Sequence, residues 1–260
     1  MTNRAVTNLF IYSPPKTGST SLFYSLAKHT NLSPSKPKEP QFFSYRFDEN
    51  NIEKYNSIFE TNNKLKFEAS TTYLDNKQSI VRIQKHCNNP KFIVVLRDPT
   101  DRYISHYKHF RAINTILNNE SLKNDFKNSI NWQEEWLEKG KHFRGLAKDD
   151  HALMENMLRQ GVYINHIKNL LSHTRDDHVL IINYNDYKTN FADTIDKICN
   201  FLNIENQKIE NNHMNGSDWW QEWANVEDEI STEMIAELRG FYKPYNEILE
   251  RYLDINFGWD

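Results

Sequence analysis

The chain has 260 residues, 38% of them hydrophobic and 13% aromatic, which is enough to bury the core of one domain and argues against disorder. The chain has only two cysteines, far apart in the sequence, which argues against a disulfide-rich secreted protein and favours a reducing, cytoplasmic compartment. It has no apolar run near the ~20 residues of a membrane span, which argues against a membrane protein. Residues 1–130 carry 19 Lys and Arg against 11 Asp and Glu, whereas residues 131–260 carry 13 against 24, so we expect an anion site in the first half and no general nucleic-acid binding.

Short apolar runs alternate with amphipathic stretches along the chain. Four runs rich in β-branched and aromatic residues predict buried strands, at residues 9–13, 65–69, 92–96 and 179–182. Apolar residues at helical spacing predict helices at residues 21–29, 79–87, 101–113, 151–171, 191–202, 230–241 and 245–253. This alternation predicts a single α/β domain over residues 1–260, with a central parallel sheet flanked by helices in three layers.

The first predicted strand leads into a candidate anion-binding segment, Pro14-Pro15-Lys16-Thr17-Gly18-Ser19-Thr20-Ser21. A helix is expected to open at about Thr20, so backbone N–H groups and the positive end of the helix point at one spot. Gly18 permits close approach of the backbone, and Lys16 places a cation over the same point. Further donors are the hydroxyls of Thr17, Ser19, Thr20 and Ser21. The alternative is an ordinary strand–turn–helix with a Ser/Thr cap.

The order of residues in this segment differs from that of an ATP-type phosphate loop. Such a loop reads G-x-x-x-x-G-K-[ST], with the Lys directly after the last Gly and the Ser/Thr on magnesium, whereas Lys16 precedes Gly18 by two positions. The strand at residues 92–96 is followed by Arg97 rather than by an Asp that could hold a metal. A cation there suits a further phosphate better than Mg²⁺, so we expect no metal and disfavour a kinase.

Arg97 is the second candidate anion ligand. It stands at the carboxyl end of a predicted strand, where open α/β sheets bind ligands. Pro99 begins the next helix at a position where its missing N–H costs little, and Ser105 lies about two turns further along. The alternative is an arginine that is neutralised by Asp98 or Asp101.

Together, these two segments resemble the sulfotransferases that use 3′-phosphoadenosine 5′-phosphosulfate (PAPS). That family holds the 5′-phosphosulfate on a strand–loop–helix of the form P-K-[ST]-G-[ST]-[ST], which residues 15–20 match. It holds the 3′-phosphate on an Arg at a strand end and a Ser eight residues later, which Arg97 and Ser105 match. Residues 38–44, 67–73 and 238–249 are similar to the heparan-sulfate and related bacterial branch. The resemblance covers nearly the whole chain and implies a P-loop-type fold.

The resemblance also implies a role for each matching residue. PAPS would be the donor and adenosine 3′,5′-bisphosphate the product, with no metal required. Lys16 would stabilise the leaving phosphate, and Glu39 matches the general base of that branch. The alternative for Glu39 is a solvated carboxylate that pairs with Lys36 or Lys38. His109 matches a position near the acceptor and is a second candidate base. The cofactor would be held by Lys16, Thr17, Gly18, Ser19, Thr20, Ser21, Arg97 and Ser105.

The acceptor and the competing functions are judged from charge. The acidic second half argues against an extended polyanion such as heparan sulfate, so we expect a small acceptor: an alcohol or amine of a natural product, a sugar or a lipid. Neither a nucleic acid nor a membrane span is expected. The alternatives are a P-loop small-molecule kinase and a non-catalytic nucleotide-binding module. Trp219, Trp220 and Trp223 could equally wall a ligand pocket or belong to the core.

Overall fold

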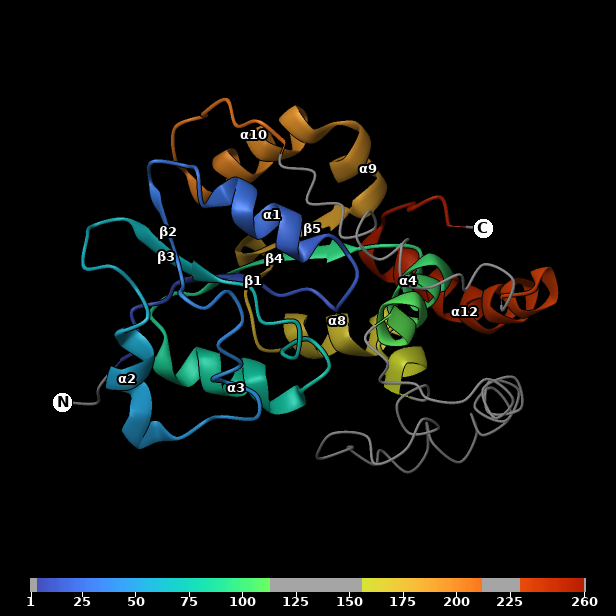
Figure 1. Ribbon diagram of the computed structural model, residues 1–260, viewed down its shortest axis with the longest axis horizontal. Coiled ribbons are helices and arrows are strands. Elements are labelled where there is room, and N and C mark those ends of the chain that lie inside the picture. Colours follow the sequence, from blue (N-terminus) through green and yellow to red (C-terminus); the bar gives the residue numbers. More distant parts are fainter. Residues whose placement is uncertain (1–3, 113–155, 212–229, 260) are drawn as a thin grey trace. The chain divides into compact units, whose positions relative to one another are not determined.

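The computed structural model describes residues 4–112, 156–211 and 230–259, which Figure 1 draws as coloured ribbons. The chain divides into two compact units, which are described separately below. The first holds Met1–Arg97 and Asn165–Asn215, and the second holds Asp98–Ile164 and Gly216–Asp260. The single domain over residues 1–260 stays a prediction. None of the described helices combines the length and the apolar composition needed to span a membrane.

The first unit is built on a five-stranded sheet with the strand order β2-β3-β1-β4-β5. Every neighbouring pair is parallel, which confirms the predicted α/β class. The strands are β1 (Leu9–Ile11), β2 (Leu32–Pro34), β3 (Leu65–Glu68), β4 (Lys91–Leu96) and β5 (Val179–Asn183). Four of them lie where the apolar runs predict strands. Strand β2 is missing from the prediction because its three residues, Leu-Ser-Pro, are too few and too polar to form a pattern.

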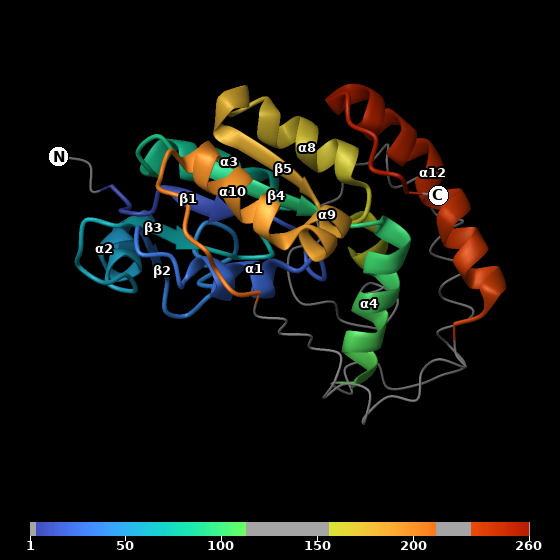
Figure 2. The same ribbon diagram turned by 90° about the horizontal axis from the view of Figure 1, so that it is seen from above.

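Helices cover both faces of this sheet (Figure 1). On one face lie α1 (Ser19–Leu26) and α10 (Phe191–Leu202), and on the other lie α3 (Lys77–His86) and most of α8 (Tyr163–Leu171). Figure 2 shows the same elements from above, in a view turned by 90°. Two short helices, α2 (Ile52–Asn56) and α9 (Tyr184–Thr189), have no counterpart in the prediction.

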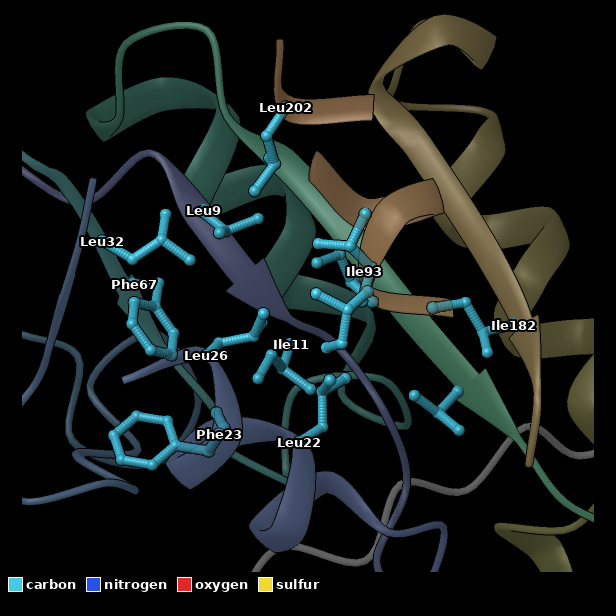
Figure 3. Packing of buried hydrophobic residues seen from close by; sticks show 14 of the residues in the cluster. Leu9, Ile11, Leu22, Phe23, Leu26, Leu32, Phe67, Ile93, Ile182 and Leu202 are labelled. Atoms are coloured by element: carbon cyan, nitrogen blue, oxygen red, sulfur yellow. The ribbon is translucent and has the colours of Figure 1, made fainter. Parts of the chain in front are cut away.

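The core between the sheet and its first helical layer is apolar. Leu22, Phe23 and Leu26 of α1 face strand residues such as Leu9 and Ile11 (Figure 3). Residues of α10 complete the cluster, among them Ile198 and Cys199, which are fully buried. The alternation of side chains along β1 sends Phe10 to the opposite face, where its ring stacks on that of Phe92 at 5.7 Å. The sheet is therefore buried on both faces, which explains the nearly continuous apolar runs in its sequence.

The second unit contains α4 (Pro99–Ala112) and α12 (Thr232–Leu253), which pack against each other. The two helices predicted at residues 230–241 and 245–253 form one, because α12 runs through Pro244. A proline inside a helix removes one N–H···O bond, here the bond to the carbonyl of Gly240. The bonds on either side keep the helix continuous.

The helix predicted over residues 151–171 is wrong in its described part, because the helical conformation is lost at residues 160–162 and α8 starts at Tyr163. A Cβ on Gly161 would lie 2.6 Å from the ring of Tyr242, so only glycine fits beside that ring. The Tyr242 hydroxyl donates to the carbonyl of Leu158 at 2.9 Å. A continued helix would use that carbonyl for the Val162 N–H, which instead donates to Arg159 O at 2.9 Å. The Gly161-Val-Tyr163 segment is thus structural.

Candidate functional site

The segment between β1 and α1 forms a tight loop. The Ser13 hydroxyl, which is fully buried, accepts the backbone N–H of Val95 at 2.8 Å and so ties the loop to β4. The Thr17 hydroxyl donates to the carbonyl of Pro14 at 2.9 Å. Since this hydroxyl has one hydrogen, Thr17 closes the loop and would offer a ligand its backbone N–H instead.

Two residues of this loop have a left-handed backbone, Lys16 with φ of +69° and Gly18 with φ of +83°. For a lysine this conformation costs of order 1–3 kcal/mol and is typical of functional sites. Alternation between right- and left-handed residues turns successive N–H groups toward one point and makes an anion-binding concavity. Gly18 is also the N-cap of α1, and the first turn of that helix holds no acidic residue. The loop therefore has a backbone geometry that could accept an anion, and its role as an anion site stays a prediction.

Lys16 and Arg97 lie close together at this loop. The Arg97 guanidinium donates from Nη1 to the carbonyl of Lys16 at 3.4 Å. Burial, and to a lesser extent the Arg97 charge, lower the pKa of Lys16 from 10.5 to about 8. Two neighbouring cations repel each other, so a bound anion that neutralises both would be favoured. The structure thus brings together two residues that are 81 positions apart in the sequence.

Tyr184, the first residue of α9, lies against both parts of this cluster. The Arg97 guanidinium stands over the Tyr184 ring, 5.0 Å from its centroid. A Cβ on Gly18 would lie 2.8 Å from Cε2 of the same ring. The neighbouring Tyr187 donates from its hydroxyl to Ser21 Oγ at 2.9 Å. The sequence analysis did not identify either tyrosine as a site residue. They could have been found from their position just after a predicted strand, because open α/β sheets bind ligands at the carboxyl ends of their strands.

Glu39 follows β2 and is held by two neighbours. The Lys38 ammonium lies 2.6 Å from Glu39 Oε1, and the Thr71 hydroxyl donates to Oε2 at 2.9 Å. Lys36, the other basic residue nearby in the sequence, pairs with Glu60 instead. The side chain of Glu39 is 31% exposed and that of Lys38 only 11%. Glu39 is therefore a fixed carboxylate that a molecule in solution can still reach.

Glu68, the last residue of β3, was not among the predicted site residues. Its carboxylate is fully buried and accepts three hydroxyl groups, those of Tyr55 and Tyr73 at 2.8 Å and that of Ser70 at 2.5 Å. Burial, and to a lesser extent the charge of Glu39, raise the pKa of Glu68 to about 7, although the three hydroxyl donors act to lower it. Glu68 could have been identified from the sequence as a glutamate that stands at the end of a predicted strand.

Lys16, Glu39, Glu68 and Arg97 belong to one edge of the sheet. All five strands are parallel, and each of these residues ends a strand or follows one. The carboxyl ends of parallel strands meet at the same edge, where open α/β sheets bind ligands. The first unit therefore places these two cations and two carboxylates at the carboxyl ends of its strands.

Ser105 and His109 lie in α4, in the second unit. Both are half-buried, and their spacing of four residues places them on one face of the helix. Their roles stay predictions. Trp219, Trp220 and Trp223 lie outside the described residues. Within the described ranges, no group of three or more His, Cys, Asp and Glu side chains could hold a metal ion.

Comparison with known proteins gives consistent similarities. A family model described as "Sulfotransferase domain" matches residues 6–241. Over 207 residues the chain is 27% identical to the bifunctional heparan sulfate N-deacetylase/N-sulfotransferase 1 of Xenopus laevis, an alignment that covers 76% of this chain and 22% of that protein. The chain thus spans about a fifth of the length of this relative.

Solved structures share the fold. The crystal structure of a sulfotransferase from Alicyclobacillus acidocaldarius matches with a TM-score of 0.74 at 21% identity and covers 97% of both chains. The mouse sulfotransferase SULT7A1, complexed with PAP, matches with a TM-score of 0.51 at 17% identity, over 79% of this chain and 62% of that one. At these sequence identities the two comparisons show a shared fold only.

Proposed function

The chain belongs to the sulfotransferase family, and from that premise we propose that it transfers the sulfuryl group of PAPS to a hydroxyl or amine of a small acceptor. The observation that carries this proposal is the pairing of Lys16 with Arg97 beside a left-handed loop that opens a helix. Such a site suits a ligand with phosphate groups at both of its ends.

The donor would bind by its phosphates. The loop at residues 15–20, with the N-terminus of α1, would hold the 5′-phosphosulfate through backbone N–H groups and the hydroxyls of Ser19, Thr20 and Ser21. Arg97 would bind the 3′-phosphate. The solved complex of a protein with this fold with PAP supports a ligand of this kind. Ser105 keeps its predicted role at the 3′-phosphate as part of this proposal.

Transfer would break the bond between sulfur and the bridging oxygen of the phosphate and form a bond between sulfur and the acceptor oxygen or nitrogen. Negative charge then grows on the bridging oxygen. The Lys16 ammonium would stabilise it, and with its pKa lowered to about 8 most of this group is still protonated at neutral pH. In transfers of this kind, positioning and charge stabilisation supply most of the rate.

The acceptor must lose a proton, and Glu39 is the proposed general base. Its carboxylate is fixed by Lys38 and Thr71 yet a third exposed, so an acceptor in solution could reach it. A positioned base contributes ~10²- to 10⁴-fold to the rate of a proton transfer. His109 is the second candidate for this role.

The acceptor is proposed to be small and neutral or cationic, because the second half of the sequence is acidic and would repel a long polyanion. The name of the relative contains heparan sulfate, a long polyanion, which is the alternative acceptor to test. An assay with PAPS that carries a radiolabelled sulfuryl group would compare glucosamine, p-nitrophenol and de-sulfated heparan chains as acceptors. Fast sulfation of the polymer would overturn the proposed acceptor class and leave sulfuryl transfer intact.

Donor binding can be tested without an acceptor. Adenosine 3′,5′-bisphosphate at ~100 times its Kd should stabilise the protein by about 2.7 kcal/mol. ATP with Mg²⁺ should stabilise it less. The reverse order would favour a kinase. Binding of the bisphosphate without transfer to any acceptor would favour a non-catalytic module.

The catalytic role of Lys16 needs a matched control. Lys16→Met should lower turnover by ~10²- to 10³-fold, the loss typical of removing one charge-stabilising donor. Lys54→Met, on an exposed part of α2, should change neither turnover nor stability. Near-normal turnover of the Lys16 variant would contradict the proposal.

A further inference from the structure

A network of hydroxyl groups connects Glu68 to the loop that carries Glu39. The turn after β3, at residues 70–73, supplies the hydroxyls, and the loop at residues 39–44 lies against this turn. The Gln41 N–H donates to Ser70 Oγ at 2.9 Å, and the Phe43 N–H donates to the Tyr73 hydroxyl at 3.2 Å. Two backbone groups of the loop are thus held by two side chains of the turn.

The direction of these hydrogen bonds is set by chemistry. A backbone N–H can only donate, so Ser70 and Tyr73 must accept from the loop. Each hydroxyl has one hydrogen left to donate, and both of these hydrogens point at Glu68, from Ser70 at 2.5 Å and from Tyr73 at 2.8 Å. All three side chains are at most 1% exposed, so water does not replace these partners. The carboxyl group of Glu68 satisfies both hydroxyls, because it accepts from Ser70 at Oε2 and from Tyr73 at Oε1.

The loop needs this support. Gln41 has a left-handed backbone with φ of +53°, a conformation that persists in a non-glycine residue only where neighbours hold it. The same turn also binds the side chain of Glu39, through the Thr71 hydroxyl at 2.9 Å. The position of Glu39 therefore depends on the turn, and the turn is oriented by Glu68.

We propose that Glu68 is a positioning residue for Glu39, because its buried carboxylate makes Ser70 and Tyr73 donate inward and so accept the Gln41 and Phe43 N–H groups. Glu68 itself touches no substrate. The inference rests on the proposed role of Glu39 as the base. It adds a buried residue, outside the predicted site, on which the rate of transfer depends.

Two tyrosines make a matched test. Tyr55 and Tyr73 both donate to Glu68 Oε1 at 2.8 Å and both are buried, but only Tyr73 accepts a backbone N–H of the loop. Tyr73→Phe should therefore lower kcat by at least about tenfold, part of the ~10²- to 10⁴-fold contribution of a positioned base. Tyr55→Phe should lower kcat less than about twofold by the same argument. Affinity for adenosine 3′,5′-bisphosphate should be unchanged in both variants.

Amide hydrogen exchange reads the same network without catalysis. Exchange of the Phe43 N–H should be faster in Tyr73→Phe than in Tyr55→Phe, and Ser70→Ala should expose the Gln41 N–H in the same way. Glu68→Gln, which keeps the volume but turns an amide donor toward the hydroxyls, should speed exchange at both positions. Equal kcat and equal exchange in the two tyrosine variants would overturn the inference. A wild-type protein that transfers no sulfate would instead overturn the proposed function, while the exchange rates would still decide the role of Glu68.

Discussion

Replacing Gly18 by alanine adds one methyl group to the loop between β1 and α1. The backbone there has φ of +83°, where an L-residue costs roughly 1–2 kcal/mol. The new Cβ would lie 2.8 Å from Cε2 and 3.1 Å from Cδ2 of Tyr184, and overpacking of this kind costs typically about 1–3 kcal/mol. The free energy of unfolding should therefore fall by about 2–5 kcal/mol. At about 2–4 °C per kcal/mol for a chain of this size, Tm should fall by roughly 4 °C or more.

Thermal unfolding and calorimetric titration with adenosine 3′,5′-bisphosphate would measure both consequences of this change. Affinity should fall together with Tm, because the N–H groups of the loop can no longer converge on a phosphate. Gly240→Ala is the matched control: a Cβ there meets no described atom within 4 Å, and alanine should stabilise the interior of α12 by roughly 0.5–1 kcal/mol.

A second variant separates strain from steric overlap. In a Tyr184→Ala background the ring is gone, so Gly18→Ala should cost only the backbone part, roughly 1–2 kcal/mol. The same loss of stability in both backgrounds would refute the steric part of the reasoning. A Gly18→Ala protein with the Tm and the nucleotide affinity of the wild type would refute all of it.

Three further predictions concern pH, the base and the break before α8. The pKa of Lys16 is lowered to about 8, so the affinity for the nucleotide, measured by calorimetry, should fall as the pH rises through 8. The reason is that a neutral amine no longer attracts the phosphate charge. Lys16→Met should remove this pH dependence. Glu39→Gln should lower kcat by ~10²- to 10⁴-fold with unchanged nucleotide affinity, whereas Glu60→Gln, at an exposed ion pair, should match the wild type in the same assay. Gly161→Ala should lower the free energy of unfolding by about 1–3 kcal/mol, because its Cβ meets the Tyr242 ring at 2.6 Å; a denaturant titration would measure the loss.

The geometry of the loop at residues 15–20 could be predicted because its signal is local, whereas its binding of an anion stays a prediction. Lys16 and Gly18 stand within a few residues of a strand end and a helix start, and the order of these elements fixes where the backbone N–H groups point. Arg97 could be predicted for the same reason, from the buried strand before it. Four strands were also found from their apolar runs, which a sheet covered on both faces produces, although β5 is half-buried except at Ile182.

The partners of these residues could not be predicted, because they are distant in the sequence. Tyr187 meets Ser21 across 166 positions, and no periodicity indicates such a contact. The role of Glu68 depends on hydroxyls from α2 and from the turn after β3, which only the folded chain brings together. The break at Gly161 likewise depends on Tyr242, whose hydroxyl meets the carbonyl of Leu158 across 84 positions.

The left-handed backbone of Lys16 makes the stability of the fold and the proposed catalytic role favour different residues at this position. Glycine would relax that backbone, whereas the proposed role at the leaving phosphate requires a long cationic side chain. Selection for a sturdier fold alone would accept Lys16→Gly, and a screen for heat resistance should recover it among inactive clones. The proposed role of Lys16 in turnover would explain why this strained position holds a lysine instead of a glycine.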